Sequence, residues 1–260
     1  MLDCLSPREI EIAREPDTDA EREALEFNRA VPRHGSFPLW HRLADYIVAA
    51  AGKGLFHPRI GFGALARSVS RSTTGMWSTY RFVHLARLVL LHRPRVIVEF
   101  GTGVSTVLLA ELIRFNHSRF GVDGTLYSLE QSPSYFEMFE REFPEELKSR
   151  VVMKLAPVRL EWFGEYRGIY YDVDHLPTEI DLAYVDGATR TRGCPQADFS
   201  YTTMNADLVR LDSLGHRIRH AVSDHRWANF LFWKAWLAPK HSVRCQRVTR
   251  SIEVRRRSDS

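Results

Sequence analysis

The chain has little cysteine and no cysteine motif. Its 260 residues include three cysteines, Cys4, Cys194 and Cys245, and no two of them stand in a CxxC spacing. Such isolated cysteines exclude a disulfide framework and a cysteine zinc site, and they are typical of proteins from a reducing compartment.

Long apolar runs are also missing. No run approaches the roughly 20 apolar residues that span a bilayer as a helix. The first residues, Met1 to Leu5, pass directly into charged sequence, which is not the pattern of a secretory signal. These features predict a cytoplasmic protein with no membrane partner.

Neither sign of charge is in large excess. Lysine and arginine number 36 against 32 acidic residues, which gives a net charge of +4. Much of the basic surplus lies in the run Arg255-Arg256-Arg257, which is typical of a solvated tail. No basic stripe interleaved with aromatics occurs elsewhere, so nucleic acid is not expected as a partner. The small-molecule class of ligand remains, and a homodimer stays an open alternative.

From Arg95 onward, short apolar runs alternate with amphipathic segments. The predicted strands are residues 96–100, 125–129, 151–155, 180–185 and 218–223, with a closing hairpin at 242–248 and 251–255. The predicted helices are residues 76–91, 105–115, 133–143, 199–211 and 226–237, and residues 162–175 are predicted to be irregular. This alternation implies a parallel, doubly wound α/β sheet. We therefore divide the chain into an extension of helices and loops (residues 1–75) and an α/β domain (residues 76–260).

The most informative stretch is the run from Val96 to Thr106. Three branched aliphatic residues lead to Glu99, then to a turn containing Gly101 and Gly103, and then to a predicted helix. A strand, a glycine turn and a helix N-terminus are typical of nucleotide-like ligand sites. The Glu99 carboxylate would repel a pyrophosphate but attract a cation. S-adenosylmethionine (SAM) carries an ammonium and a sulfonium, so these residues favour SAM over NAD.

Three segments then resemble class I SAM-dependent methyltransferases, most closely the small-molecule O-methyltransferase branch. They are Glu99-Phe100-Gly101-Thr102-Gly103, Leu126-Tyr127-Ser128-Leu129-Glu130, and the strand that ends in Val185-Asp186-Gly187. The resemblance implies a Rossmann-like sheet of seven strands, the last of them antiparallel. It also implies methyl transfer from SAM to an oxygen, with a nitrogen as second choice, of a small-molecule acceptor.

The resemblance further assigns residues to parts of the cofactor. Glu130 would accept hydrogen bonds from the ribose hydroxyls, and Asp186 would face the methionine ammonium or the acceptor. The remaining assignments are Gly101, Thr102, Gly103 and Ser105 to the methionine moiety, and Ala156 and Pro157 to adenine. Simpler interpretations stay open, because Glu130 can cap the helix at Pro133 and an Asp before a glycine is common in turns.

Asp224 and His225 follow the fifth predicted strand. Asp224 can be a helix N-cap, or it can join Asp186 and His225 in removing a proton from an acceptor. Some related enzymes hold a divalent metal with an Asp after the fourth strand and Asp-Asn after the fifth. His225 stands where that Asn would be, and Mg²⁺ prefers oxygen ligands, so a metal is not favoured.

Other features leave the function open. The fifth strand region, Leu214 to His220, is unusually polar for a central strand. The aromatic residues Trp77, Trp162, Tyr166, Tyr170 and Tyr171 fit either an acceptor wall or core packing. Two alternatives therefore remain: a non-catalytic methyltransferase-like binding module, and an NAD-dependent oxidoreductase. The second is disfavoured because Thr106 replaces the third glycine of GxGxxG.

Overall fold

The computed structural model describes residues 79–187, 204–224, 227–246 and 251–257. The predicted extension (residues 1–75) and its boundary at residue 76 lie outside the described residues. The elements, in chain order, are α5 (Thr79–His92), β1 (Val96–Phe100), α6 (Val104–Phe120), β2 (Thr125–Glu130), α7 (Pro133–Glu142), the 3₁₀-helix η3 (Glu145–Arg150), β3 (Val151–Leu155), β4 (Val158–Phe163), β5 (Tyr166–Tyr171), β6 (Glu179–Val185), β7 (Met204–Asn205), α8 (Asp207–Ser213), β8 (Arg217–Asp224), α9 (Trp227–Leu237), β9 (His241–Gln246) and β10 (Ser251–Arg256).

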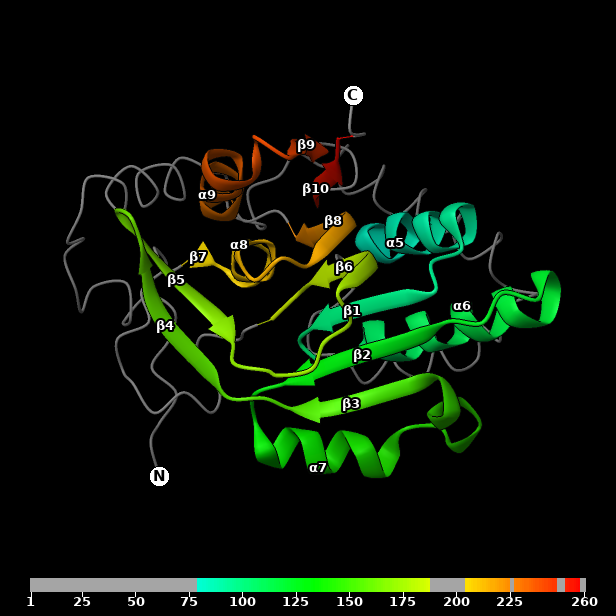
Figure 1. Cartoon of the computed structure of the whole chain (residues 1–260). Helices are drawn as coiled ribbons and strands as arrows, with labels where there is room; N and C mark the ends of the chain where they lie inside the picture. Colours follow the sequence, from blue (N-terminus) through cyan, green and yellow to red (C-terminus); the bar gives the residue numbers. More distant parts are fainter. Residues whose placement is uncertain (1–78, 188–203, 225–226, 247–250, 258–260) are drawn as a thin grey trace, which may run out of the picture.

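Seven of these strands form one sheet, in the order β3-β2-β1-β6-β8-β10-β9 (Figure 1). The pairs β3–β2, β2–β1, β1–β6 and β6–β8 are parallel. The last strand, β10, lies between β8 and β9 and is antiparallel to both. The predicted fold class, a doubly wound sheet whose last strand is reversed, is confirmed.

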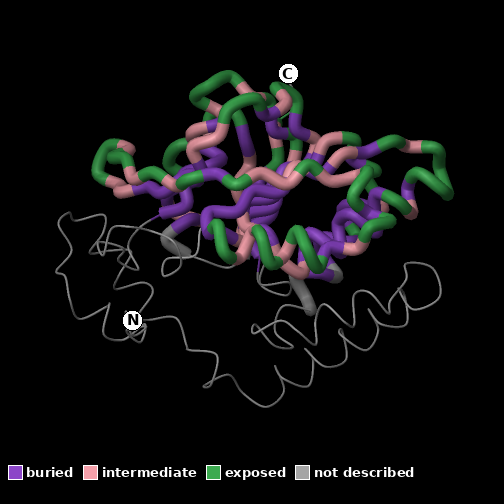
Figure 2. The backbone as a smooth tube through the Cα atoms, turned by 90° about the horizontal axis from the view of Figure 1, so that it is seen from below, coloured by how far each residue is buried: buried purple, intermediate pink, exposed green. Residues whose placement is uncertain are grey.

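The alternation of side chains along β1 and β6 separates two apolar layers. On one face, Val98 and Phe100 pack with residues of α8, α9 and β5. On the other face, Ile97 packs with residues of α5 and α6. Figure 2 shows the buried residues gathered in the strands at the centre and the exposed ones around them. Glu99, between Val98 and Phe100, therefore points to the face that α6 covers.

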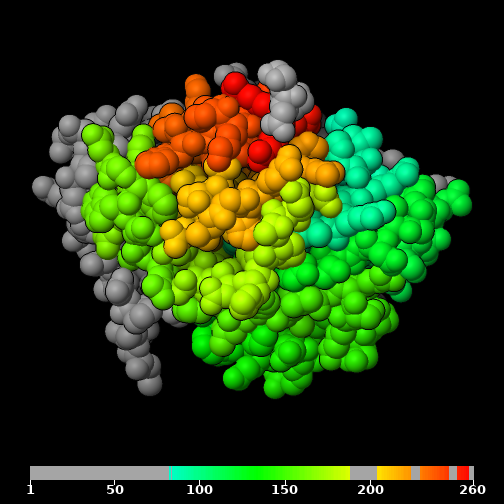
Figure 3. Space-filling model, viewed as in Figure 1, coloured from blue at the N-terminus to red at the C-terminus, as the bar shows by residue number. Residues whose placement is uncertain are grey.

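Most of the region predicted to be irregular, residues 162–171, belongs to a β-hairpin, so the prediction was wrong there; residues 172–175 form neither strand nor helix. β4 and β5 pair in antiparallel register from Val158↔Tyr171 to Phe163↔Tyr166, with Gly164 at φ +59° in the turn. Aromatic contacts from Phe163 to Phe232 and Trp236 hold the hairpin against α9. Figure 3 shows α9, in orange, directly beside the light-green hairpin. The sequence signal was weak because these aromatics pack on a distant helix rather than on one sheet face.

The predicted helix at residues 199–211 is also wrong in its first part. Met204 and Asn205 form the short strand β7, which pairs in parallel with β5, and α8 begins only at Asp207. This pairing joins positions more than 30 residues apart, so no local pattern could reveal it. Residues 199–203 lie outside the described part of the chain.

The polar start of the fifth strand has a structural explanation. The exposed Arg217 and Arg219 lie at the beginning of β8, where they form ion pairs with Glu179 and Asp181 of the neighbouring strand β6. The next part of β8 carries the buried Ala221 and Val222. The polar side chains at the start of β8 are therefore exposed, and the apolar ones that follow are buried.

Asp181 connects β1, β6 and β8 at the end of the sheet where β8 begins. Its Oδ2 accepts hydrogen bonds from the backbone N–H groups of Arg95 (2.9 Å) and Val96 (3.1 Å), at the start of β1. We expect Asp181→Ala to lower the free energy of unfolding by about 1–3 kcal/mol, because the Val96 N–H loses its acceptor in a partly buried position. Urea unfolding measures the difference. Asp181→Asn keeps one oxygen and should lose less; an equal loss in both variants would contradict this account.

Candidate functional site

Most of the predicted site residues lie at one edge of the sheet, where the parallel strands end. Residue pairing places Phe100 beside Leu129 and Val185, and Val185 beside Ser223. The C-terminal ends of β1, β2, β3, β6 and β8 therefore lie along this edge (Figure 1). This is the edge at which doubly wound folds bind ligands.

Glu99 is a fully buried carboxylate at this edge. Its Oε2 accepts hydrogen bonds from the hydroxyls of Thr106 (2.6 Å) and Ser128 (2.7 Å). Its Oε1 has no hydrogen-bond partner among the described residues. Burial raises the pKa of Glu99, the hydroxyls of Ser105, Thr106 and Ser128 oppose the rise, and the nearby Asp186 adds to it; the resulting pKa is about 7. A buried oxygen without a partner is costly and is a ready acceptor for a ligand donor.

Gly101 is required by the fold itself. It has φ +104°, a conformation that side chains with a Cβ rarely adopt. A Cβ there would lie 2.6 Å from the backbone N of Gly187 and 2.8 Å from its Cα. The backbone N–H groups of Asp186 and Gly187 both donate to the Phe100 carbonyl, and that of Gly101 donates to Leu129. The turns after β1 and β6 are thus locked together.

Gly103 is different, because nothing in the described structure requires a glycine there. Its φ is 176°, which is ordinary extended backbone. The nearest atom to a Cβ at this position would be the Tyr135 hydroxyl at 3.8 Å, which is ordinary contact distance. Gly103 therefore leaves open space at the start of α6, where a ligand can approach the backbone.

Thr102 and Ser105 are buried beside these glycines. The Thr102 hydroxyl hydrogen-bonds the Ser128 hydroxyl at 2.9 Å. The Thr106 hydroxyl accepts from the backbone N–H of Gly103 at 2.8 Å while donating to Glu99. Thr106 and Ser128 were not among the predicted site residues, although Ser128 lies within the second motif of the resemblance and Thr106 follows the first by three residues.

Glu130, at the end of β2, is buried and turned onto its own backbone. Its Oε1 accepts from the N–H groups of Gln131 (2.9 Å) and Ser132 (2.8 Å). The N-cap of α7 is Ser132, whose hydroxyl accepts from the Tyr135 N–H. Glu130 thus shapes the turn before α7 without being its N-cap.

Of the remaining predicted residues, four lie at or just after the ends of β3, β6 and β8: Ala156, Pro157, Asp186 and Asp224. Ala156 is buried, and its N–H donates to the Glu130 carbonyl at 2.8 Å; Pro157 next to it is exposed. Asp186 is half-buried directly after β6. Asp224 is the last residue of β8, and His225 lies outside the described residues. No group of three or more metal-binding side chains occurs within the described ranges.

Sequence reasoning missed a second polar group near this edge, formed by Asn205, Asp207 and Asn229. Asn205 Nδ2 donates to the Gly187 carbonyl at 2.7 Å. Asp207 Oδ1 accepts from the Tyr171 N–H at 2.7 Å, and burial raises the pKa of Asp207 to about 7. The available signal was the sequence Asn205-Ala206-Asp207 before a helix. It was missed because one continuous helix was predicted across these residues.

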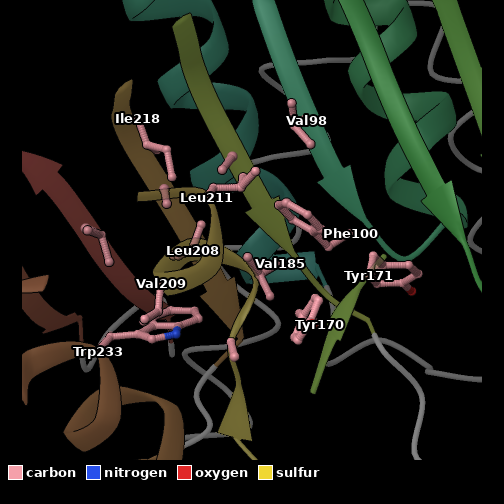
Figure 4. Close-up of a cluster of buried hydrophobic side chains, with 14 of the residues drawn as sticks. Val98, Phe100, Tyr170, Tyr171, Val185, Leu208, Val209, Leu211, Ile218 and Trp233 are labelled. Atoms are coloured by element: carbon pink, nitrogen blue, oxygen red, sulfur yellow. The ribbon is translucent and has the colours of Figure 1, made fainter. Parts of the chain in front are cut away.

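The aromatic residues of the hairpin serve mainly as core. Tyr170 and Tyr171 are buried in the cluster that also contains Phe100 and Val185 (Figure 4). Trp162 is about half exposed, and Tyr166 packs against Phe232. Trp77 lies outside the described residues.

The strand order and the reversed β10 together decide the fold. This is a class I methyltransferase fold. No family model matches the chain, and no curated protein sequence matches it. Across the described ranges, no helix is long and apolar enough to cross a membrane.

Three solved structures show a distant likeness. The methyltransferase domain of bacterial CtHen1 is 12% identical, covering 68% of this chain and 97% of that one, with a TM-score of 0.40. The O-methyltransferase NovP is 13% identical, covering 84% and 98%, with a TM-score of 0.37. An ACR of the COG1565 superfamily from Burkholderia thailandensis is 17% identical, covering 58% and 41%, with a TM-score of 0.25. At these values, function has to be argued from the site itself.

Proposed function

We propose that the chain is a SAM-dependent methyltransferase that acts on an oxygen, or as second choice a nitrogen, of a small molecule. The observation that carries the proposal is the buried Oε1 of Glu99, which has no hydrogen-bond partner among the described residues, while Thr106 links Oε2 of the same carboxylate to the backbone N–H of Gly103. A buried carboxylate oxygen offers a charge-assisted hydrogen bond to an ammonium group. The glycine offers the space that the rest of such a ligand needs.

The same carboxylate argues against a dinucleotide. A pyrophosphate bound at this turn would lie beside the Glu99 carboxylate. Asp186 is a second acidic residue there, close enough to raise the pKa of Glu99. Thr106 takes the third glycine position, and its hydroxyl is engaged by Glu99. These contacts favour a cationic ligand over NAD.

The other assignments follow from position along the edge. We assign Gly101, Thr102, Gly103 and Ser105 to the methionine moiety, and Ala156 and Pro157 to adenine. We assign Glu130 to the ribose hydroxyls; its Oε1 also accepts hydrogen bonds from the N–H groups of Gln131 and Ser132. The cytoplasmic location and the homodimer stay predictions.

Bound SAM supplies an already activated methyl group, so the protein's part is placement and proton handling. The buried Glu99 and the adjoining glycine turns would fix one reactant and leave the acceptor side near Asp186. An oxygen acceptor must lose its proton, and the groups we propose for this are Asp186, Asp224 and His225. A divalent metal is possible at that step but is not favoured.

Calorimetric titration with SAM, S-adenosylhomocysteine and NAD tests the proposal. We expect micromolar binding of the two adenosyl ligands and none of NAD. Glu130→Ala should weaken adenosyl binding roughly 10- to 100-fold, since it removes charged hydrogen bonds. Glu130→Gln keeps an acceptor for Gln131 and Ser132 and separates ribose binding from support of the turn.

The other functional classes give distinct outcomes. A folded protein that binds neither adenosyl ligand would contradict the proposal, and binding of NAD instead would favour an oxidoreductase. Adenosyl binding without methyl transfer across a screen of small oxygen and nitrogen acceptors would favour a non-catalytic binding module. The screen is best run with and without Mg²⁺, which also tests the disfavoured metal.

A further inference from the structure

Asn205, Asp207 and Asn229 form a polar network that the proposed chemistry does not use. Each side chain is almost completely buried, with 2%, 2% and 1% of its surface exposed. They come from three elements, β7, α8 and α9. Polar groups buried to this degree cost stability unless they are hydrogen-bonded, so the bonds they make indicate their role.

Asn205 is held from the α9 side through its main chain. Its N–H donates to Asn229 Oδ1 at 2.8 Å, and its carbonyl accepts from Trp233 Nε1 at 2.8 Å. Both partners lie on α9. Trp233 is itself fully buried in the core beside α8 (Figure 4). The backbone of Asn205 is therefore fixed relative to α9.

The side chain of Asn205 reaches in the opposite direction. Its Nδ2 donates to the Gly187 carbonyl at 2.7 Å, while its Oδ1 accepts from the Asp207 N–H at 3.2 Å. One residue thus joins α9 to the turn that follows β6. These two partners select one orientation of the amide, because Gly187 offers an acceptor to Nδ2 and Asp207 offers a donor to Oδ1.

Asp207 supports the same turn from another side. Its Oδ1 holds the N–H of Tyr171. The Tyr171 hydroxyl lies so close to Gly187 that a Cβ on that glycine would be 2.5 Å from it. The turn is therefore confined by Gly101, Tyr171 and Asn205, and its position depends on all three.

One of the two segments that this network connects carries a candidate proton-handling group, and the other begins shortly after a second one. Asp186 belongs to the turn after β6, and α9 begins at Trp227, shortly after Asp224 ends β8. We propose that Asn205 is a positioning residue that holds the Asp186–Gly187 turn at a fixed place relative to α9, and so sets the geometry of the site. The catalytic consequence rests on the proposed function; the positioning itself does not.

Asn205→Asp tests the positioning through pH. The substitution keeps Oδ1 for the Asp207 N–H but replaces the Nδ2 donor with an oxygen. When ionised, that oxygen faces the Gly187 carbonyl without a proton; when protonated, it can donate as the amide does. We expect amide hydrogen exchange at Asp186 and Gly187 to be at least tenfold faster in the variant than in the wild type at pH 8. At pH 6 the two exchange rates should be nearly equal. Peptides from β2 and β3 should not change.

Asn229→Asp is the matched control. It places a new carboxyl in the same network and keeps Oδ1 as the acceptor for the Asn205 N–H. The Nδ2 that it replaces has no hydrogen-bond partner within the described residues. It should leave exchange at Gly187 near the wild-type rate. Asn205→Ala, which lacks the donor at every pH, should speed exchange at both pH values.

The affinity for S-adenosylhomocysteine supplies the second measurement. At pH 8, Asn205→Asp should bind S-adenosylhomocysteine about tenfold more weakly than the wild type does at that pH. At pH 6 its affinity should return to that of the wild type. Wild-type exchange at Gly187 in both Asn205 variants would overturn the positioning role. Equal effects of Asn205→Asp and Asn229→Asp would also overturn it, because a buried carboxyl alone would then explain them. If the wild type bound no adenosyl ligand, the proposed function would fail while the exchange data still decided the positioning.

Discussion

Gly101→Ala is expected to lower the free energy of unfolding by about 3–5 kcal/mol. The alanine would have to adopt φ +104° and place its Cβ 2.6 Å from the Gly187 backbone, which cannot move as a flexible side chain can. Backbone strain and overpacking each cost about 1–3 kcal/mol. For a domain of this size the melting temperature should fall by roughly 10 °C or more. Thermal unfolding followed by circular dichroism measures it.

Gly103→Ala is the matched control, two residues along the same turn. Its backbone is extended and, among the described residues, its Cβ would lie near only the Tyr135 hydroxyl, at 3.8 Å, so stability should change by less than about 1 kcal/mol. Binding of S-adenosylhomocysteine should nevertheless weaken at least tenfold, because the methyl group occupies the space assigned to the ligand. Wild-type affinity in a folded Gly103→Ala protein would show that the ligand does not approach there.

The second large effect concerns Glu99 and pH. With its pKa raised to about 7, Glu99 in the empty site is mostly neutral below pH 7 and ionised above it. An ammonium ligand selects the ionised form. Affinity should therefore rise by up to tenfold per pH unit below pH 7, with release of up to one proton per ligand bound. The rise should end near pH 8, where an α-amino group begins to lose its own proton.

Glu99→Gln removes this dependence while keeping the shape. The amide oxygen can still accept from Thr106 and Ser128, so the fold should persist. We expect affinity above pH 7 to fall roughly 10- to 100-fold and its slope below pH 7 to disappear. Calorimetry in buffers of different ionisation enthalpy measures the number of protons released per ligand bound. An unchanged slope in the variant would assign the titration to another group.

Stability should depend on pH in the opposite direction. A carboxyl whose folded pKa lies above its unfolded value stabilises the protein most below the unfolded pKa, here about 4.5, and loses that contribution as pH rises through about 7. In Glu99→Gln this part of the decline should vanish. Asp207, whose pKa is also about 7, leaves a residual decline.

The positions of most strands along the chain followed from the sequence, because there the local pattern and the long-range packing agree. Strands β1 and β3 were predicted with their observed bounds, because branched aliphatic residues in short runs are typical of buried strands. The closing pair β9 and β10 was predicted from alternation alone. The β4–β5 hairpin and β7 were not, because their pairing and their contacts with α9 join residues far apart in the chain.

The sequence by itself determined the sheet, the glycine turn after β1 and the carboxylates at the strand ends, since local chemistry specifies each of them. Only the tertiary structure decided what these residues do. It showed that Gly101 is needed to pack against Gly187 while Gly103 is not needed by the fold, and that one oxygen of Glu99 is satisfied while the other is not. It also brought Asn205 to Gly187. Such differences arise from contacts between segments that are distant in sequence, where no spacing rule applies.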